Sequence, residues 1–119
     1  MLYDIFQLKE LIKVGDNMRT LYHPNREEIQ FSSVLYALSD QIRLQIVNML
    51  MEQNEQSCGA LNIPVAKSTL SHHFKVLRES GVMYTRIEGT QRFISIRTED
   101  LNARFPGLLD AVLQATEPY

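Results

Sequence analysis

The sequence predicts a mainly α-helical fold with one small β-hairpin, and two observations support this prediction. Apolar residues recur at helical spacing along most of the chain, in stretches separated by turn-forming residues. Residues 83–87 and 92–97 are instead rich in β-branched and aromatic residues, and the Glu88-Gly89-Thr90-Gln91 stretch between them is a hairpin signal. With 119 residues the chain is expected to form one domain, small enough that a partner subunit would add useful burial.

The first 24 residues are expected to form an N-terminal extension, and residues 25–119 the folded domain. Within the extension, residues 2–14 have an amphipathic helical pattern. Met18 is a candidate for an alternative start of translation, a hypothesis that would place residues 1–17 outside the main domain.

The first helix of the domain is predicted to follow the breaker cluster His23-Pro24-Asn25, because Glu27 and Glu28 suit the positive end of a helix dipole. This helix has apolar residues on more than one side, namely Ile29, Phe31, Val34, Leu35, Tyr36 and Leu38. Such a helix needs burial against more than its own small domain, which predicts a subunit interface.

The next helix is predicted over residues 41–52, with Asp40 as its N-cap. Its apolar stripe comprises Leu44, Val47 and Met51. The polar residues 53–57 are predicted to form a loop, and residues 58–62 leave room for only a short helical turn before Pro64.

A further helix is predicted to begin at Lys67 or Ser68 and to run to about Ser80. Its apolar face comprises Leu70, Phe74 and Leu77, and Gly81 follows where a C-cap glycine belongs. The opposite face carries hydrogen-bonding side chains, namely Ser68, Thr69, Ser71, His72 and Lys75. A polar-faced helix followed by two short strands predicts a recognition helix and a wing.

The last helix is predicted to be capped by Thr98, to break at Pro106-Gly107 and to resume at Leu108. Its apolar character makes it, together with the helix over residues 29–38, a candidate for a dimer interface. The predicted order is therefore α-α-α-α-β-β-α, a winged helix-turn-helix that dimerises through its N- and C-terminal helices.

Positive charge is confined to one third of an otherwise acidic chain with a net charge of −2. Residues 67–97 contain six lysines and arginines against two glutamates, a net charge of +4, whereas residues 1–66 and 98–119 each carry −3. A contiguous basic segment is the electrostatic footprint expected of a surface that faces phosphates.

Two segments, ALSDQIRLQIV at residues 37–47 and STLSHHFKVLRESG at residues 68–81, closely resemble the ArsR family of bacterial winged-helix regulators. The resemblance covers roughly residues 26–97 and includes the wing. It implies a DNA-binding transcriptional regulator, a homodimeric repressor that reads an inverted repeat in double-stranded DNA and releases it when an effector binds. Two departures are Gln41, where the family commonly has proline, and a shortened stretch between Leu61 and Ser68, which predicts a truncated first motif helix.

This reading places the recognition helix in the major groove and the wing near the minor groove or the backbone. The expected DNA contacts are Lys67, Ser68, Thr69, Ser71, His72, Lys75, Arg78, Arg86 and Arg92. The alternative for the same residues is a solvated helix face and a charged hairpin. His73 lies about 100° from His72 around the helix and is therefore expected to be partly buried.

The metal sites of the family are not reproduced in this sequence. Metal-sensing members carry paired cysteines in the first motif helix, or Asp and His ligands along the C-terminal helix. Here Cys58 is the only cysteine and no His or Cys follows His73, so no metal and no cofactor are expected. Cys58 is either a thiol redox switch or a small core residue, and an effector would be a small molecule or an oxidant.

The alternatives to a DNA-binding regulator are an enzyme and a protein-binding module. The carboxylates are scattered and the serines lie on the basic helix face, so no catalytic arrangement is apparent and an enzyme is not expected. The serious alternative is a winged-helix module that binds another protein and binds DNA weakly or not at all. No apolar stretch is long enough to span a membrane and no secretory signal pattern is present, so the expected location is the cytoplasm.

Overall fold

The computed structural model describes residues 21–115, so the expected helix over residues 2–14 and the alternative start at Met18 lie outside the described part. In chain order the elements are η1 (Arg26–Glu28), α2 (Phe31–Ala37), α3 (Gln41–Gln53), β1 (Gln56–Ser57), η2 (Cys58–Ala60), α4 (Lys67–Glu79), β2 (Met83–Glu88), β3 (Gln91–Ile96), α5 (Thr98–Arg104) and α6 (Leu108–Ala115). The predicted class, a mainly α fold with a β-hairpin arranged as a winged helix-turn-helix, is confirmed.

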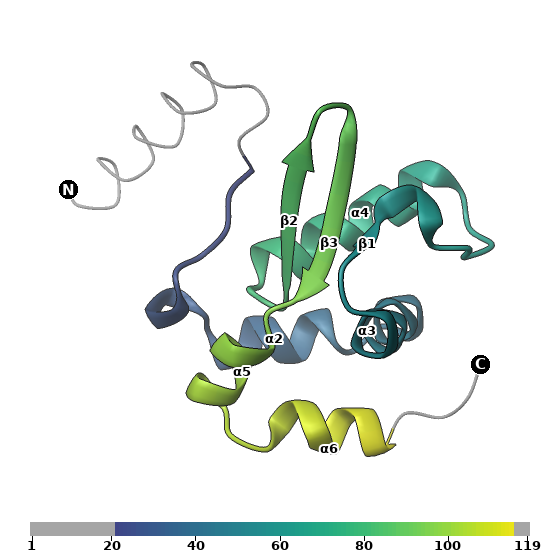
Figure 1. Cartoon of the computed structure of the whole chain (residues 1–119). Coiled ribbons are helices and arrows are strands. Elements are labelled where there is room, and N and C mark those ends of the chain that lie inside the picture. Colours follow the sequence, from purple (N-terminus) through teal and green to yellow (C-terminus); the bar gives the residue numbers. More distant parts are fainter. Residues whose placement is uncertain (1–20, 116–119) are drawn as a thin grey trace.

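The β2–β3 hairpin projects from a layer of helices (Figure 1). Helix α4 lies behind the hairpin, α3 lies below β1, and α6 runs along the base of the molecule. The inner face of the hairpin packs on α3 and α4, and it contributes the fully buried Met83 and Ile94 to the core. The recognition helix and the wing are therefore held together by one shared core.

The sheet has three strands in the order β1-β3-β2, so the prediction of a purely two-stranded wing was incomplete. Gln56 and Ser57 were predicted to lie in a loop, but they pair antiparallel with Ile94 and Phe93 of β3. A two-residue strand has no periodicity of its own, because the hydrogen bonds that define it come from a partner far along the chain. The hairpin itself turns tightly at Gly89 and Thr90, with Glu88 opposite Gln91 and a φ of +62° at Gly89.

The predicted first helix of the domain is interrupted, which corrects the expectation of one continuous helix. Asn25 and Glu28 form a capping box around the short turn η1, in which the Asn25 N–H donates to Glu28 Oε1 at 2.8 Å. The chain is then extended at Ile29, whose side chain is only 1 % exposed. Burying Ile29 requires this extended backbone, so α2 begins only at Phe31.

The C-terminal helical region begins differently from the prediction but breaks where expected. Arg97, and not Thr98, occupies the N-cap position of α5, and the Thr98 hydroxyl instead lies 3.7 Å from the sulfur of Met51. The carboxylate of Asp100 accepts a hydrogen bond from Arg97 Nε at 2.9 Å, so an ion pair stabilises this helix start in place of a hydroxyl cap. The chain breaks between α5 and α6 around Gly107, which has a φ of +85°.

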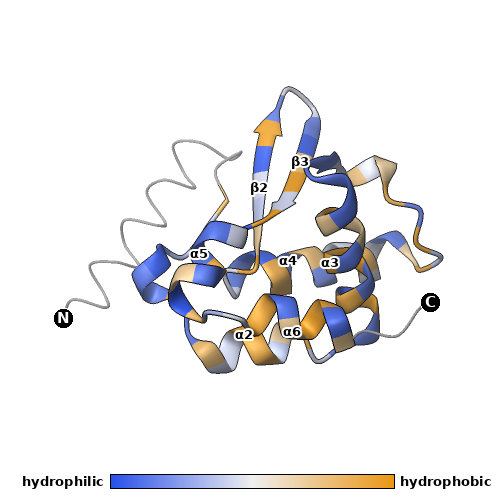
Figure 2. Cartoon of the chain, turned by 60° about the horizontal axis from the view of Figure 1, so that its bottom comes forward, coloured by the Kyte–Doolittle hydropathy of each residue, from blue (hydrophilic) through white to orange (hydrophobic). Residues whose placement is uncertain are grey.

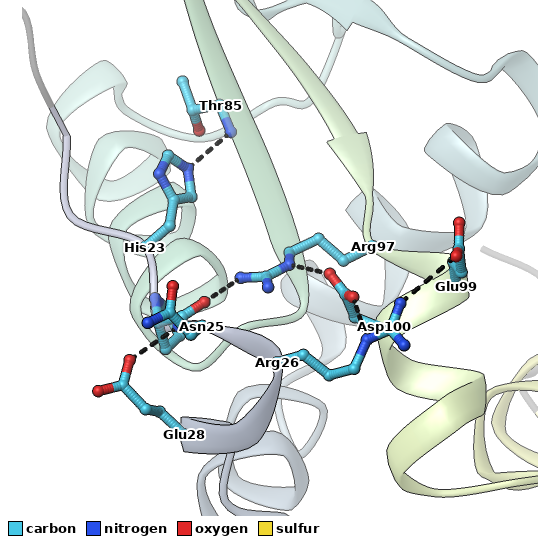
Figure 3. A network of polar contacts seen from close by, with 9 residues as sticks. His23, Asn25, Arg26, Glu28, Thr85, Arg97, Glu99 and Asp100 are labelled. Carbon is cyan, nitrogen blue, oxygen red and sulfur yellow. Dashed lines mark hydrogen bonds and ion pairs between the residues drawn. The ribbon is translucent and has the colours of Figure 1, made fainter.

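Residues 21–26, most of which the sequence assigned to the N-terminal extension, lie against the sheet and α5 through a polar network (Figure 3). The N–H of Thr85 donates to His23 Nε2 at 3.0 Å, and Arg97 Nη1 donates to the Pro24 carbonyl at 2.7 Å. Arg26 pairs with Asp100 at 2.7 Å. This segment is called the strap below; the boundary at residue 24 stays a prediction.

Candidate DNA-binding surface

Helix α4 presents a continuous exposed face of polar side chains. Six of the nine expected DNA contacts lie on it and are exposed, namely Lys67, Ser68, Thr69, Ser71, His72 and Lys75. The opposite side of the helix carries Leu77, which is completely buried, and the partly buried Leu70 and Phe74. This division of one helix into a polar face and a core face is the arrangement that a recognition helix requires.

The C-terminus of α4 is fixed by a close approach between two segments. Gly81 has a φ of +91°, and the N–H groups of Gly81 and Val82 donate to the carbonyls of Arg78 and Leu77 as in a Schellman motif. A Cβ at Gly81 would lie 2.6 Å from Cγ1 of Ile29. The glycine is therefore needed both for its left-handed backbone and for the space that Ile29 occupies.

A buried arginine anchors α4 to α3. Arg43 is 5 % exposed, and its Nη1 donates to Nδ1 of His73 at 3.1 Å. Its other donors reach the carbonyls of Ala37, at 2.7 Å, and Tyr36, at 3.2 Å. As expected, His73 faces inward while His72 is exposed.

Arg43 was not singled out in the sequence, although a signal for it was present. It lies at i, i+3, i+4 and i+7 spacing with Ile46, Val47 and Leu50, all of which are buried, so it falls on the core stripe of α3. The predicted N-cap is confirmed beside it, since Asp40 accepts a hydrogen bond from the Arg43 N–H at 3.0 Å. Hydrogen bonding by that N–H and burial of the side chain together align the start of α3 with α4.

The first helix of the motif is reduced to the single turn η2, as the short stretch before Pro64 predicts. The chain then runs without regular structure to Ala66, whose carbonyl accepts the first hydrogen bond of α4 from Leu70. No side chain caps the N-terminus of α4. The backbone N–H groups of its first turn therefore remain available to an external acceptor such as a phosphate.

The two expected wing arginines point to opposite faces of the hairpin. Arg86 is opposite Phe93 in the register, whereas Arg92 is opposite Ile87, one residue further along each strand. Arg86 is held by carboxylates, with Glu55 at 2.9 and 3.2 Å and Glu88 at 3.0 Å, and its guanidinium lies 4.6 Å from the Phe93 ring centroid. These carboxylates raise the pKa of Arg86 and compete with any phosphate for it.

Arg92 is exposed and lies on the hairpin face that looks toward α4. Arg78, also an expected contact, is largely enclosed, with 12 % of its side chain exposed and its Nε buried without a partner among the described residues. Burial lowers the pKa of Arg78, and the nearby positive charge of Arg92 contributes. Among the cations expected to contact DNA, Lys67, Lys75 and Arg92 are thus exposed and have no carboxylate partner within residues 21–115.

Cys58 is half-buried at the start of η2. Burial raises the pKa of its thiol, against an opposing effect of Arg92, so the reactive thiolate form is disfavoured. Within residues 21–115 no group of three histidine, cysteine or acidic side chains is arranged to hold a metal ion. In the same part of the chain no helix combines the length and apolarity needed to cross a membrane.

Comparison with known sequences agrees with this surface. The sequence model of a family described as bacterial regulatory protein, arsR family, matches residues 40–85, which contain α3, η2 and α4. The chain is 34% identical over 84 residues to the uncharacterized HTH-type transcriptional regulator YceK of Bacillus subtilis (strain 168), covering 68% of this chain and 84% of the relative. It is 33% identical over 86 residues to the transcriptional activator HlyU of Vibrio cholerae, covering 71% and 79%.

Proposed function

The chain belongs to the arsR family of bacterial regulatory proteins, which are DNA-binding transcriptional regulators, and on that premise we propose that it is a homodimeric repressor that reads an inverted repeat. The observation that supports a reading function best is the exposed polar face of α4 on a helix whose other side is buried. Ser71, His72 and Thr69 are the proposed base contacts, and Lys67 and Lys75 the phosphate contacts.

An apolar surface made by α2 and α6 is the proposed dimer interface. Phe31 and Leu35 of α2 are 49% and 44% exposed, and the Phe31 ring lies 5.2 Å from that of Phe105, which follows α5. Helix α6 adds the partly buried Leu108, Val112 and Leu113. Figure 2 shows α2 and α6 side by side on the face turned forward, with orange apolar segments on both.

The dimer is tested by the oligomeric state of the purified protein. Leu35→Glu places a charge in the apolar surface and should give a monomer by analytical ultracentrifugation. This monomer should bind an inverted repeat more weakly than the wild type does, because only one DNA-binding surface contacts one half-site. The matched control is Gln53→Glu, at an exposed position at the end of α3. A wild-type protein that is monomeric at micromolar concentration would contradict the proposal.

Sequence reading is tested by selection of bound duplexes from random DNA, followed by fluorescence anisotropy on the recovered site. We expect an inverted repeat whose half-sites are about one helical turn apart, or a multiple of that. Lys67, Lys75 and Arg92, which have no carboxylate partner in the described part of the chain, should give a log–log dependence of affinity on salt with a slope of about −5 for a dimer. Ser71→Ala should relax base preference, and Lys75→Ala should weaken all sites and make the slope shallower.

The same experiment addresses the alternative of a protein-binding module. Binding that is absent or insensitive to salt, in a protein that still forms complexes through the α2 and α6 surface, would favour that alternative over the regulator. A reporter fused to the selected site decides the sign of regulation. A repressor lowers expression in cells, whereas an increase would indicate an activator, as one relative is named.

A further inference from the structure

A hollow of about 350 Å³ lies between α2 and the C-terminal turn of α4. Its lining comprises Ser32, Ser33, Tyr36, Val76, Glu79 and Ser80. The volume lies in the range of sites for small molecules. The proposed contacts with DNA do not involve this hollow. The hollow lies between α2, which is proposed to form the dimer interface, and α4, which is proposed to bind DNA.

The chemistry of the lining favours a positively charged ligand. Glu79 supplies a carboxylate, 45% exposed, and its ion-pair partner among the described residues, Arg78, is no closer than 3.9 Å. The last turn of α4 adds the partial negative charge of a helix C-terminus. Arg43, which approaches Tyr36, is buried and donates to His73 and two carbonyls, so it does not pair with Glu79. Among the described residues the one ion pair of Glu79 is the long contact with Arg78, which leaves the carboxylate incompletely neutralised.

Tyr36 adds an aromatic surface to the same hollow. Tyr36 is 61% exposed, although its carbonyl accepts hydrogen bonds from Arg43 Nη2 at 3.2 Å and from the Ser39 hydroxyl at 2.7 Å. The Arg43 guanidinium already lies 5.2 Å from the ring centroid, which is cation–π distance. An exposed ring beside a carboxylate and two serine hydroxyls is a combination suited to an organic cation.

The hollow is distinct from the apolar surface proposed for dimerisation. Around α2, Phe31 and Leu35 lie on one stripe, and Ser32 and Tyr36 lie about 100° away. A second subunit on the Phe31 stripe therefore leaves the Ser32 stripe facing α4. A molecule in the hollow would contact both helices.

We propose that this hollow binds a small organic cation, with an ammonium or guanidinium group against Glu79 and Tyr36, and that the bound cation strengthens DNA binding. The proposed effect on DNA binding rests on the proposed function of the chain as a DNA-binding regulator. Glu79 lies four residues after Lys75, so the two side chains share one face of α4. A bound cation neutralises a negative charge one turn away from a residue that contacts phosphate, which lowers the electrostatic cost of bringing DNA to the helix.

Ligand binding is tested on the free protein, independently of DNA. Choline and propylguanidinium are titrated as chloride salts into ¹⁵N-labelled protein at constant ionic strength, with 3,3-dimethyl-1-butanol as the neutral shape-matched control for choline. We expect saturable amide shifts centred on Ser33, Tyr36 and Glu79 for at least one cation and none for the alcohol. Glu79→Gln should weaken binding about fivefold or more, because it removes a charge-assisted contact. Glu99→Gln, which removes an exposed carboxylate on α5, should not.

The effect on DNA is measured next, with the ligand compared with equal concentrations of sodium chloride. The cation should raise the affinity of the wild type for its selected site about twofold to threefold, and Glu79→Gln should have this higher affinity already and respond no further. Shifts that never saturate, that also occur with the alcohol, or that saturate with unchanged affinity in Glu79→Gln would overturn the site. Saturable binding with unchanged DNA affinity would overturn its effector role. Failure of every form to bind DNA would instead refute the proposed reading function while leaving the cation site standing.

Discussion

Arg43 on α3 donates a hydrogen bond to His73 on α4, with 3.1 Å between Nη1 and Nδ1, at a point where both side chains are buried. The exposed neighbour, His72, belongs to the proposed reading face. Two adjacent histidines thus lie in different environments. His73 is bonded to α3 in the core, whereas His72 lies on the surface proposed to contact DNA.

Loss of Arg43 should destabilise the domain. Arg43→Met keeps much of the apolar stem but removes the arginine donor from His73 and from the Ala37 carbonyl, and one of several donors from the Tyr36 carbonyl, at a cost of about 2–4 kcal/mol in the free energy of unfolding. Urea denaturation followed by circular dichroism measures this. Lys67→Met, on the exposed face of α4, is the control and should change stability by about 0.5 kcal/mol or less. Equal effects of both substitutions would show that the buried network contributes nothing.

Alanine substitutions at two glycines should distinguish the cost of backbone strain from the cost of a steric clash. Gly81 and Gly107 have φ values of +91° and +85°, but an added Cβ meets Ile29 only at Gly81 and meets nothing within 4 Å at Gly107. Gly107→Ala should therefore cost only the strain of a left-handed residue, about 1 kcal/mol, and Gly81→Ala about 2–4 kcal/mol. Thermal or urea unfolding of the pair is the measurement, and the reverse order would contradict the close contact.

The two wing arginines should differ in their effect on DNA binding. Arg92→Ala should lower affinity and make the salt slope shallower, because Arg92 is exposed and has no carboxylate partner among the described residues. Arg86→Ala should leave the slope nearly unchanged, since Glu55 and Glu88 already neutralise that guanidinium. Anisotropy titrations at several salt concentrations distinguish the two. Glu55→Gln tests the reason directly, because it removes one of the two carboxylates that pair with Arg86 and should strengthen DNA binding.

The strap should make stability depend on pH through His23. Its Nε2 accepts a hydrogen bond from the Thr85 N–H, which a protonated ring cannot do, and burial together with Arg78 and Arg97 lowers the pKa of His23 below 6.5. The unfolded chain therefore takes up this proton more readily than the folded one. The contribution of His23 to stability is complete above about pH 6.5 and is lost as the pH falls from there toward the lower folded-state pKa.

Urea unfolding between pH 8 and pH 5 measures this dependence. His23→Asn replaces the imidazole with a side chain that does not titrate, so the stability of this variant should fall less steeply between pH 7 and pH 5 than that of the wild type. Identical slopes in the two proteins would exclude a contribution from His23. His72 and His73 are present in both proteins, so the difference between the two slopes reports on His23.

Most helices of this chain are determined by patterns within a dozen consecutive residues. The stripe of Leu70, Phe74 and Leu77, the cap at Asp40 and the turn at Gly81 each depend on neighbours a few positions away, and all are found as predicted. The polar face of α4 follows from the same periodicity. The exposed polar face of α4, which is the proposed DNA-binding surface, was therefore visible in the sequence, and so was the family to which the chain belongs.

Other features depend on residues far apart in the chain, and only the tertiary structure determines them. The two-residue strand β1 exists because β3 offers it hydrogen bonds, and the first helix breaks at Ile29 because that side chain packs into the space beside Gly81. The availability of positive charge also depends on the tertiary structure. Residues 67–97 contain six lysines and arginines, but in the folded chain Arg78 is largely buried and Arg86 and Arg97 pair with carboxylates. Local spacing determines which residues share a face, whereas only packing determines which charges remain free to meet DNA.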